Sequence, residues 1–167
     1  MAMSKERVRD FVARLAELQP KGEVSRKRDL GDSIMTAVVI APFGPSPTKF
    51  TDLGRLRLQE CERVVALRTE LTRCGAKVIE EGDTLTVYPS QLHGAEIETY
   101  HDHRMAMCFA TLGLKVPGMR IKNPACVNKT FPTFFQKLAA EPPHGLGAEI
   151  RDGHSGRVLG GEDLLPA

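Results

Sequence analysis

Residues 64–88 read VVALRTELTRCGAKVIEEGDTLTVY and join a helical pattern directly to a hairpin pattern. One apolar stripe recurs at helical spacing: Val64, Leu67, Leu71 and Cys74. We predict a helix within Arg57–Cys74, because Gly75 is a typical residue to end it. Two short strand patterns, Ala76–Glu80 and Thr84–Tyr88, flank an EGD turn and predict a β-hairpin.

On the N-terminal side, residues Ile34–Ala41 are apolar on every face. Periodicity alone leaves a buried strand and a buried helix open for this run. Asp32 and Ser33 are good N-cap residues, so we predict a buried helix, followed by a short strand at Thr48–Thr51. A further helix pattern covers Val8–Leu18.

On the C-terminal side, strands and helices continue to alternate. We predict strands at Ile97–Tyr100 and Met119–Lys122, and helices at Met105–Leu114 and Pro132–Leu138. This order predicts a mixed α/β (α+β) fold. Two stretches share the order of a helix, a Gly or Pro break and a short strand, which indicates a structural repeat.

Length and composition describe an ordinary globular chain. The 167 residues are 41% apolar and 26% charged, about one domain's worth. The longest apolar run, 37–43, is too short to span a bilayer, and residues 1–10 lack the apolar core of a signal peptide. We therefore expect a cytoplasmic protein with no membrane partner. A net charge of +2 and 5% aromatic residues do not favour a nucleic-acid partner.

The cysteines and the C-terminal region add two expectations. Four widely spaced cysteines without a CxxC pair predict reduced thiols rather than a zinc ribbon or a disulfide framework. After Glu141 the chain is rich in Gly and Pro, so we divide it into residues 1–140 and a C-terminal extension, 141–167. An Asp152-Gly153 turn there predicts a small hairpin.

One polar cluster precedes the helix predicted over residues 34–41, and a second lies at the start of the helix predicted within residues 57–74. Asp32 is either a plain helix cap or a reactive carboxylate, and the two roles are compatible. With a helix beginning near Gln59, Glu60 and Arg63 lie on one face. That pair is either a surface ion pair or a base beside an anion-binding arginine at a helix start.

The remaining clusters surround His101-Asp102-His103-Arg104 and Lys129. The HxH spacing permits a metal site, but the chain offers no clear third ligand. An arginine at a helix N-terminus suits a carboxylate or phosphate instead. Lys129, in a short loop near these charges, is a candidate proton donor.

In this order, the clusters resemble the C-terminal part of EPSP synthase (3-phosphoshikimate 1-carboxyvinyltransferase). The matching motifs are DLGDSIMT at 29–36, QECER at 59–63, DHRMAM at 102–107 and KTFP at 129–132. The GAKV segment at 75–78 fits as well, and the resemblance covers roughly Asp29–Leu138. The sibling family of UDP-N-acetylglucosamine enolpyruvyl transferases fits less well, because DHRM and KTFP belong to the shikimate branch.

The resemblance implies repeated small α/β units of the family's inside-out barrel, with residues 1–140 forming part of one half-molecule. It implies transfer of the enolpyruvyl group of phosphoenolpyruvate to the 5-hydroxyl of shikimate 3-phosphate, without a metal or an organic cofactor. By resemblance, Asp32 meets the shikimate hydroxyls, Glu60 is the second acid/base, and Lys129 is an acid or an anion contact.

The implied substrate-binding residues are Arg63, Arg104, His103, Arg55 and Gln59. Arg63 and Arg104 would clamp phosphoenolpyruvate, and His103 would support them. Two positions depart from the family, which usually has Lys at the position of Gln59 and often Asn at that of Arg55. Either Arg55 or Arg57 is a hypothetical replacement for the missing charge.

The family folds as two halves with the substrates between them, whereas this chain resembles the later part of one half. We therefore expect little or no turnover by the chain alone, and a complementary N-terminal half as a partner. One alternative is a non-catalytic module that binds phosphorylated ligands or a protein. Another, a nucleic-acid binder using Arg26-Lys27-Arg28, has weak support.

Overall fold

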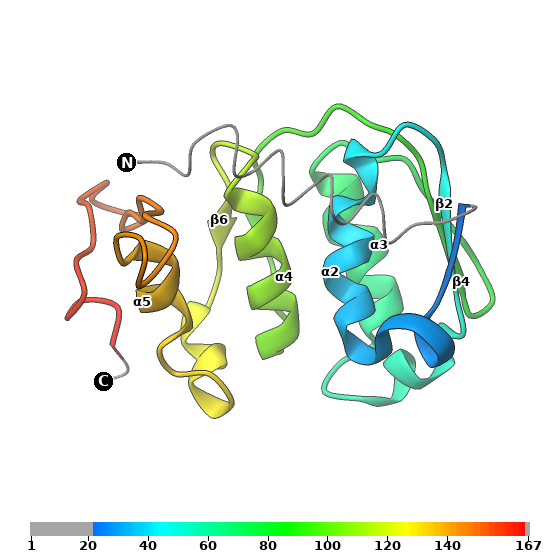
Figure 1. Ribbon diagram of the computed structural model, residues 1–167, viewed down its shortest axis with the longest axis horizontal. Coiled ribbons are helices and arrows are strands. Elements are labelled where there is room, and N and C mark those ends of the chain that lie inside the picture. The colour runs from blue at the N-terminus through cyan, green and yellow to red at the C-terminus, as the bar shows by residue number, and fades with distance from the viewer. Residues whose placement is uncertain (1–21, 166–167) are drawn as a thin grey trace.

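The computed structural model describes residues 22–165, which form two units of alternating strands and helices (Figure 1). The first unit contains β1 (Glu23–Ser25), α2 (Ile34–Ile40), β2 (Thr48–Thr51), α3 (Arg63–Arg73), β3 (Val78–Glu81) and β4 (Thr84–Val87). The second contains β5 (Glu96–Ile97), α4 (His103–Gly113), β6 (Arg120–Ile121) and α5 (Phe134–Ala139). The helix predicted at Val8–Leu18 lies outside the described residues.

Both units begin with two parallel strands joined through a helix. In the first unit β1 pairs with β2, and the antiparallel hairpin β3–β4 completes a sheet of order β1-β2-β4-β3. In the second unit β5 pairs with β6 across α4. The structure therefore contains the repeat indicated by the sequence, as a shared strand-helix-strand order.

Helices form the middle of the molecule. Helix α2 packs against α3 and α4, and Figure 1 shows the three helices side by side, with the four-stranded sheet on one side and β6 on the other. Six of the seven residues of α2 are buried, which explains why this helix is apolar on every face. The buried-helix prediction is confirmed, but Ser33 makes no side-chain capping bond.

Helix α3 begins later than the sequence pattern indicated. A 3₁₀ segment, Leu53–Leu58, precedes it, and the Glu62 carboxylate caps it by accepting a hydrogen bond from the Val65 N–H at 2.7 Å. The prediction that Glu60 and Arg63 share a helix face is therefore wrong, because Glu60 precedes the helix. The predicted end is confirmed, since Gly75 follows with φ of +93°.

Arg57 fastens the 3₁₀ segment to the hairpin. Its guanidinium contacts Glu62 at 3.0 Å, Glu80 at 2.8 Å and Asp83 at 3.0 Å. These contacts fix the chain immediately before Gln59. They also engage the charge of Arg57 with three carboxylates, which gives no support to the hypothesis that Arg57 replaces the missing lysine charge.

Strands β5 and β6 have two residues each, fewer than the predicted four. β5 is followed by Tyr100 and His101 at positive φ, and β6 by Asn123 at φ of +47°, so the extended backbone ends early. Past α5, Ala148 N–H donates to Leu138 at 2.9 Å, and Arg151 pairs with Val158 around the predicted turn. The division at residue 140 stays a prediction.

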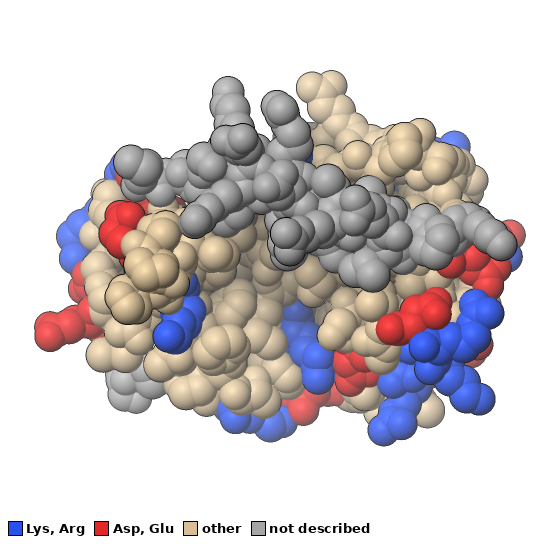
Figure 2. Space-filling model, in the orientation of Figure 1, with Lys and Arg blue, Asp and Glu red and all other residues tan. Residues whose placement is uncertain are grey.

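Charges of both signs mix on the surface. Figure 2 shows Lys and Arg side chains at the lower right of this face, interleaved with Asp and Glu. The basic run 26–28 is divided, because Arg26 contacts Asp32 and Arg28 contacts Glu23. This arrangement gives no support to nucleic-acid binding by that run. Within residues 22–165, no helix is both long and apolar enough to cross a membrane.

Truncation of Leu67 tests the helical layer. Leu67 on α3 is fully buried, so Leu67→Ala should lower the free energy of unfolding by about 2–5 kcal/mol. Leu58 is 87% exposed, so the matched Leu58→Ala should change it by less than about 0.5 kcal/mol. Urea denaturation followed by circular dichroism measures both, and equal losses would contradict this packing.

Candidate functional site

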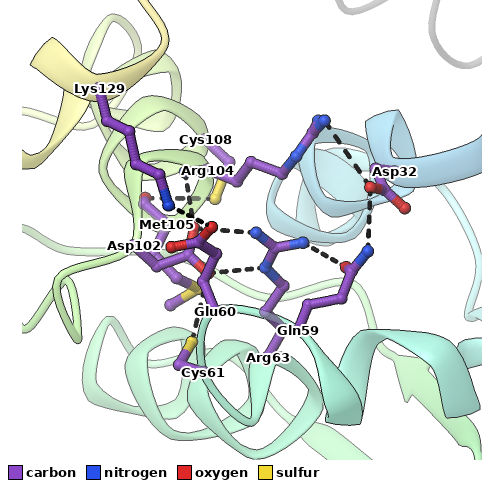
Figure 3. A network of polar contacts seen from close by, with 10 residues as sticks. All are labelled: Asp32, Gln59, Glu60, Cys61, Arg63, Asp102, Arg104, Met105, Cys108 and Lys129. Carbon is purple, nitrogen blue, oxygen red and sulfur yellow. Dashed lines mark hydrogen bonds and ion pairs between the residues drawn. The ribbon is translucent and has the colours of Figure 1, made fainter.

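Polar and charged side chains from four separate segments converge near the starts of α3 and α4 (Figure 3). They come from the turn before α2, the turn before α3 and its first residue, the start of α4, and the 3₁₀ helix Pro124–Lys129. The members are Asp32, Gln59, Glu60, Arg63, Asp102, Arg104 and Lys129. These segments are far apart in sequence, so the site depends on packing between the two units.

A buried ion pair lies at the centre of this cluster. Arg63 Nε donates to Asp102 Oδ2 at 2.6 Å and Nη2 donates to Oδ1 at 3.2 Å, with side chains 2% and 0% exposed. Asp102 Oδ1 also accepts the Arg104 N–H at 2.8 Å and caps α4. Burial acts to raise the pKa of Asp102, but Arg63 and the Arg104 N–H outweigh it, so this pKa is lowered.

Gln59 connects this pair to Asp32. Its side-chain carbonyl accepts from Arg63 Nη1, and its amide Nε2 donates to Asp32 Oδ2 at 3.4 Å. Asp32 Oδ2 also lies 3.7 Å from Arg104 Nη2. Asp32, Gln59, Arg63, Asp102 and Arg104 therefore form a closed polar ring. An amide fits between a guanidinium and a carboxylate because it both accepts and donates.

Asp32 has a further cation that the sequence analysis did not place there. Arg26 Nη2 donates to Asp32 Oδ1 at 2.9 Å. Burial acts to raise the pKa of Asp32, but Arg26, Gln59 and Arg104 together lower it. Asp32 is therefore a carboxylate at neutral pH, and its expected capping role is replaced by these side-chain contacts.

Glu60 and Lys129 form a second, exposed pair beside the ring. Lys129 Nζ donates to Glu60 Oε1 at 2.7 Å, and the side chains are 63% and 34% exposed, respectively. The hydrogen bond and charge of Lys129 lower the pKa of Glu60. Exposed pairs of this kind contribute little to stability, so an incoming anion can separate them.

His103 and His101 take different environments. His103 is 8% exposed, and burial lowers its pKa, so it is neutral near pH 7. Its Nδ1 is buried without a hydrogen-bond partner among residues 22–165. His101 is exposed and lies 2.9 Å from Asn123. No three His, Cys, Asp or Glu side chains in the described part of the chain are arranged to hold a metal ion.

Arg55 is the predicted site residue that stands apart. It is exposed, and among the described residues it makes no hydrogen bond or ion pair. The structure leaves its charge available for a ligand but does not place it in the ring. Whether Arg55 replaces the missing charge stays a prediction.

Sequence reasoning missed the partners inside the ring. Asp102 was considered only as a metal ligand, although an Asp before an apolar helix is also a cap signal. Cys61 Sγ lies 3.4 Å from Asp102 Oδ2, and burial together with that carboxylate raises the Cys61 pKa to about 12. This thiol is therefore protonated and unreactive at neutral pH. All four cysteines are free, as predicted.

The arrangement suits an anionic ligand that exchanges protons. Arg104 is 38% exposed and Lys129 63%, so both present positive charge to solvent beside the carboxylates Asp32 and Glu60. Arg63 adds positive charge beneath the surface, next to Gln59. Its side chain is too buried to touch a ligand without a rearrangement. Carboxylates next to cations can hold phosphate or carboxylate groups and accept protons.

Comparison with known proteins places this site in a family. The family profile described as EPSP synthase (3-phosphoshikimate 1-carboxyvinyltransferase) matches residues 2–138. The chain belongs to the EPSP synthase family. All the ring residues fall inside the matched range, as do Glu60 and Lys129.

Individual family members cover the same region. The 3-phosphoshikimate 1-carboxyvinyltransferase of Nostoc punctiforme is 49% identical over 110 residues, which are 66% of this chain and 26% of that protein. That of Trichormus variabilis is 41% identical over 129 residues, 77% of this chain and 30% of that protein.

Solved structures agree with the sequence comparison. An EPSP synthase from Acinetobacter baumannii matches with a TM-score of 0.59 and 28% identity, covering 68% of this chain and 27% of that one. The chain therefore spans between a quarter and a third of the length of these relatives. The α/β class is confirmed, together with the likeness to EPSP synthase structures.

Replacement of Asp102 tests the central pair. Asp102→Asn leaves Arg63 buried without a counter-charge, so the free energy of unfolding should fall by about 3–5 kcal/mol at pH 7. The control Asp83→Asn breaks an exposed contact of Arg57 and should cost less than about 1 kcal/mol. Equal losses from the two variants, measured by urea denaturation, would contradict the central role of the pair.

The same variant has a defined pH dependence. Because the folded-state pKa of Asp102 is lowered, its contribution is complete above the unfolded pKa of about 4 and is lost as the pH falls through the folded value. The difference in stability between wild type and Asp102→Asn should therefore shrink below about pH 4.

Proposed function

We propose that this chain is a segment of an enolpyruvyl transferase. The reaction moves the enolpyruvyl group of phosphoenolpyruvate to the 5-hydroxyl of shikimate 3-phosphate and releases phosphate, a step of aromatic amino acid biosynthesis. The observation that carries the proposal is the ring of Asp32, Arg63 and Arg104 beside the Glu60–Lys129 pair, in a chain of the EPSP synthase family. A cytoplasmic location belongs to the same proposal.

The chemistry requires three proton transfers and strong charge stabilisation. A base removes the proton of the 5-hydroxyl while an acid protonates the methylene carbon of phosphoenolpyruvate, and the oxygen bonds to the adjacent carbon. The tetrahedral adduct then loses a methyl proton and phosphate, which restores the carbon–carbon double bond and forms the enol ether. Fixed cations around the adduct are usually the largest contribution to such catalysis.

The residues of this chain match those requirements. Asp32, ionised and held by Arg26, is the carboxylate for the hydroxyls of shikimate 3-phosphate. Glu60 and Lys129 are already within hydrogen-bonding distance, so one can supply a proton and the other remove one. Arg104 binds the anionic groups, with Arg63 and neutral His103 behind it. These roles are proposals for each residue.

A second candidate function has support of its own. Gln59 closes a ring whose charges neutralise one another, and the family usually has a lysine at this position. A ring satisfied internally favours a binding module over a catalyst, with a phosphorylated small molecule or a protein as its ligand. Under the first proposal, the partner is a complementary N-terminal half that supplies the opposite wall of the site.

Reconstitution tests the catalytic proposal. The chain alone should release phosphate from phosphoenolpyruvate and shikimate 3-phosphate at background rate. Addition of the part of the Nostoc punctiforme relative that this chain does not match should produce turnover above background. The control mixture contains the Glu60→Gln variant, which should stay near background because the acid/base pair is lost.

Outcomes of this assay separate the candidates. Robust turnover by the chain alone would contradict the need for a second half. Turnover that survives Glu60→Gln unchanged would contradict the assigned acid/base pair. No turnover by any mixture, together with ligand binding by the chain, would favour the binding module.

Anion binding is tested by substitution of Arg104. Arg104→Met should weaken binding of phosphoenolpyruvate about 10- to 100-fold, the usual effect of losing one charge-assisted hydrogen bond. Arg120→Met is the matched control, because the Arg120 side chain is exposed and lies 3.7 Å from Glu96, which is not a ring residue. Calorimetric titration measures both, and equal affinities would contradict the placement of the anion.

A further inference from the structure

We propose that Glu70 of α3, acting through Tyr100, is a positioning residue that holds the start of α4 in the geometry that binds the ligand. The inference rests on the proposed function for the identity of that ligand. Glu70 touches none of the ring residues, and its role follows from its contacts with the segment that precedes α4.

Glu70 is a fully buried carboxylate with a complete set of partners. Its Oε1 accepts from the Tyr100 hydroxyl at 2.8 Å, and its Oε2 accepts the Glu98 N–H at 3.2 Å. Arg73, one turn further along α3, lies 3.5 Å from Oε2 and also donates to the Glu96 carbonyl at 3.1 Å. The second half of α3 therefore binds the segment 96–100 through a buried charge.

The segment that Glu70 binds has an unusual backbone. Tyr100 and His101 follow one another at φ of +53° and +55°, a region that residues with side chains rarely adopt. Such conformations persist only where the surroundings over-determine them, and they cluster at functional sites. Here the Tyr100 hydroxyl is fixed by Glu70, and the His101 ring contacts Asn123 at 2.9 Å.

The strained backbone at Tyr100 and His101 places the next residue, Asp102, in the ring. Asp102 N–H donates to Thr99 at 2.9 Å, which closes the turn, and the Asp102 carboxylate then binds Arg63 and the Arg104 N–H. Helix α3 thus binds the segment 100–102 at two points. Arg63 contacts Asp102, and Glu70, two helical turns later, accepts from Tyr100. Loss of the Glu70–Tyr100 hydrogen bond lets the strained backbone at residues 100 and 101 relax, which moves Asp102 and the backbone of Arg104.

A purely structural role does not account for this arrangement. A buried carboxylate is costly to desolvate, and an apolar pair would pack α3 against this segment without that cost. The charge is held where the backbone is strained and next to the exposed Arg104. Supporting contacts of this kind orient the residues that meet a ligand.

The test uses Tyr100→Phe, Glu70→Gln and the double variant. Tyr88→Phe is the matched control, because Tyr88 is the only other tyrosine of the chain and its ring contacts Lys77 away from the turn. Val87→Ala removes buried volume from β4 and controls for a general loss of stability. Tyr100→Phe removes only the hydroxyl oxygen, so it still tests the positioning role if Glu70→Gln fails to fold.

Two readouts do not require a substrate. Burial and the Glu70 carboxylate raise the pKa of Tyr100 to about 12, so its absorbance titration should move toward about 10 in Glu70→Gln. Cys61 reports on Asp102, which lies 3.4 Å away and helps to keep the thiol protonated. Its alkylation by iodoacetamide, followed by peptide mass spectrometry, should accelerate roughly tenfold in both single variants, with buried Cys108 as the internal reference.

The third readout is the affinity for phosphoenolpyruvate. Both single variants should bind it roughly tenfold more weakly, as is usual when the support of a ligand-binding group is removed. The double variant should be no weaker than the single variants, because both changes break one contact. Tyr88→Phe and Val87→Ala should match wild type in affinity and in Cys61 reactivity.

The outcomes separate this inference from the proposed function. Unchanged Cys61 reactivity and affinity in Tyr100→Phe would overturn the positioning role, as would equal changes in Val87→Ala. If wild type fails to bind phosphoenolpyruvate while the Tyr100 and Cys61 readouts respond as expected, the proposed function fails and the positioning role stands.

Discussion

The Arg63–Asp102 ion pair is the contact on which the site depends. It joins two residues 39 positions apart, at the first residue of α3 and the cap of α4. Removing both charges from water is expensive, and the pair persists because further hydrogen bonds satisfy both partners: Arg63 donates to the Gln59 carbonyl, and Asp102 accepts from the Arg104 N–H. The starts of two helices from different units are thereby locked together.

That constraint determines which charges remain available at the surface. Arg63 is committed to the pair and Arg57 to the hairpin, so neither faces a ligand directly. Arg104 and Lys129 stay partly exposed to solvent, although each contacts one carboxylate, Asp32 and Glu60 respectively. A site with neutralised inner charges and exposed outer cations can attract an anion without carrying an unpaired buried charge.

The sequence predicted the local parts of this structure and missed the contacts between them. Strand β2 and the hairpin β3–β4 follow from short strand patterns and turn residues within a few positions, and helix α2 from an apolar run that follows cap-type residues. The start of α3 was misplaced, because contacts of Arg57 with the hairpin 23 residues or more away hold its preceding turn. The contact of Glu70 with Tyr100 has no local signal, because the packing of α3 against the segment before α4 makes it. Arg26 contacts Asp32 only six positions away, but neither periodicity nor turn residues predict that pairing.

The position of the site separates what packing of this chain depends on from what the proposed chemistry would need. Its helices pack on one another and bury a continuous core. The ring residues, in contrast, lie near the starts of helices rather than in this core. Arg104 in the ring and Lys129 beside it are exposed to solvent. Under the proposed function, chemistry that needs a dry, enclosed site would require an opposing surface over these exposed side chains.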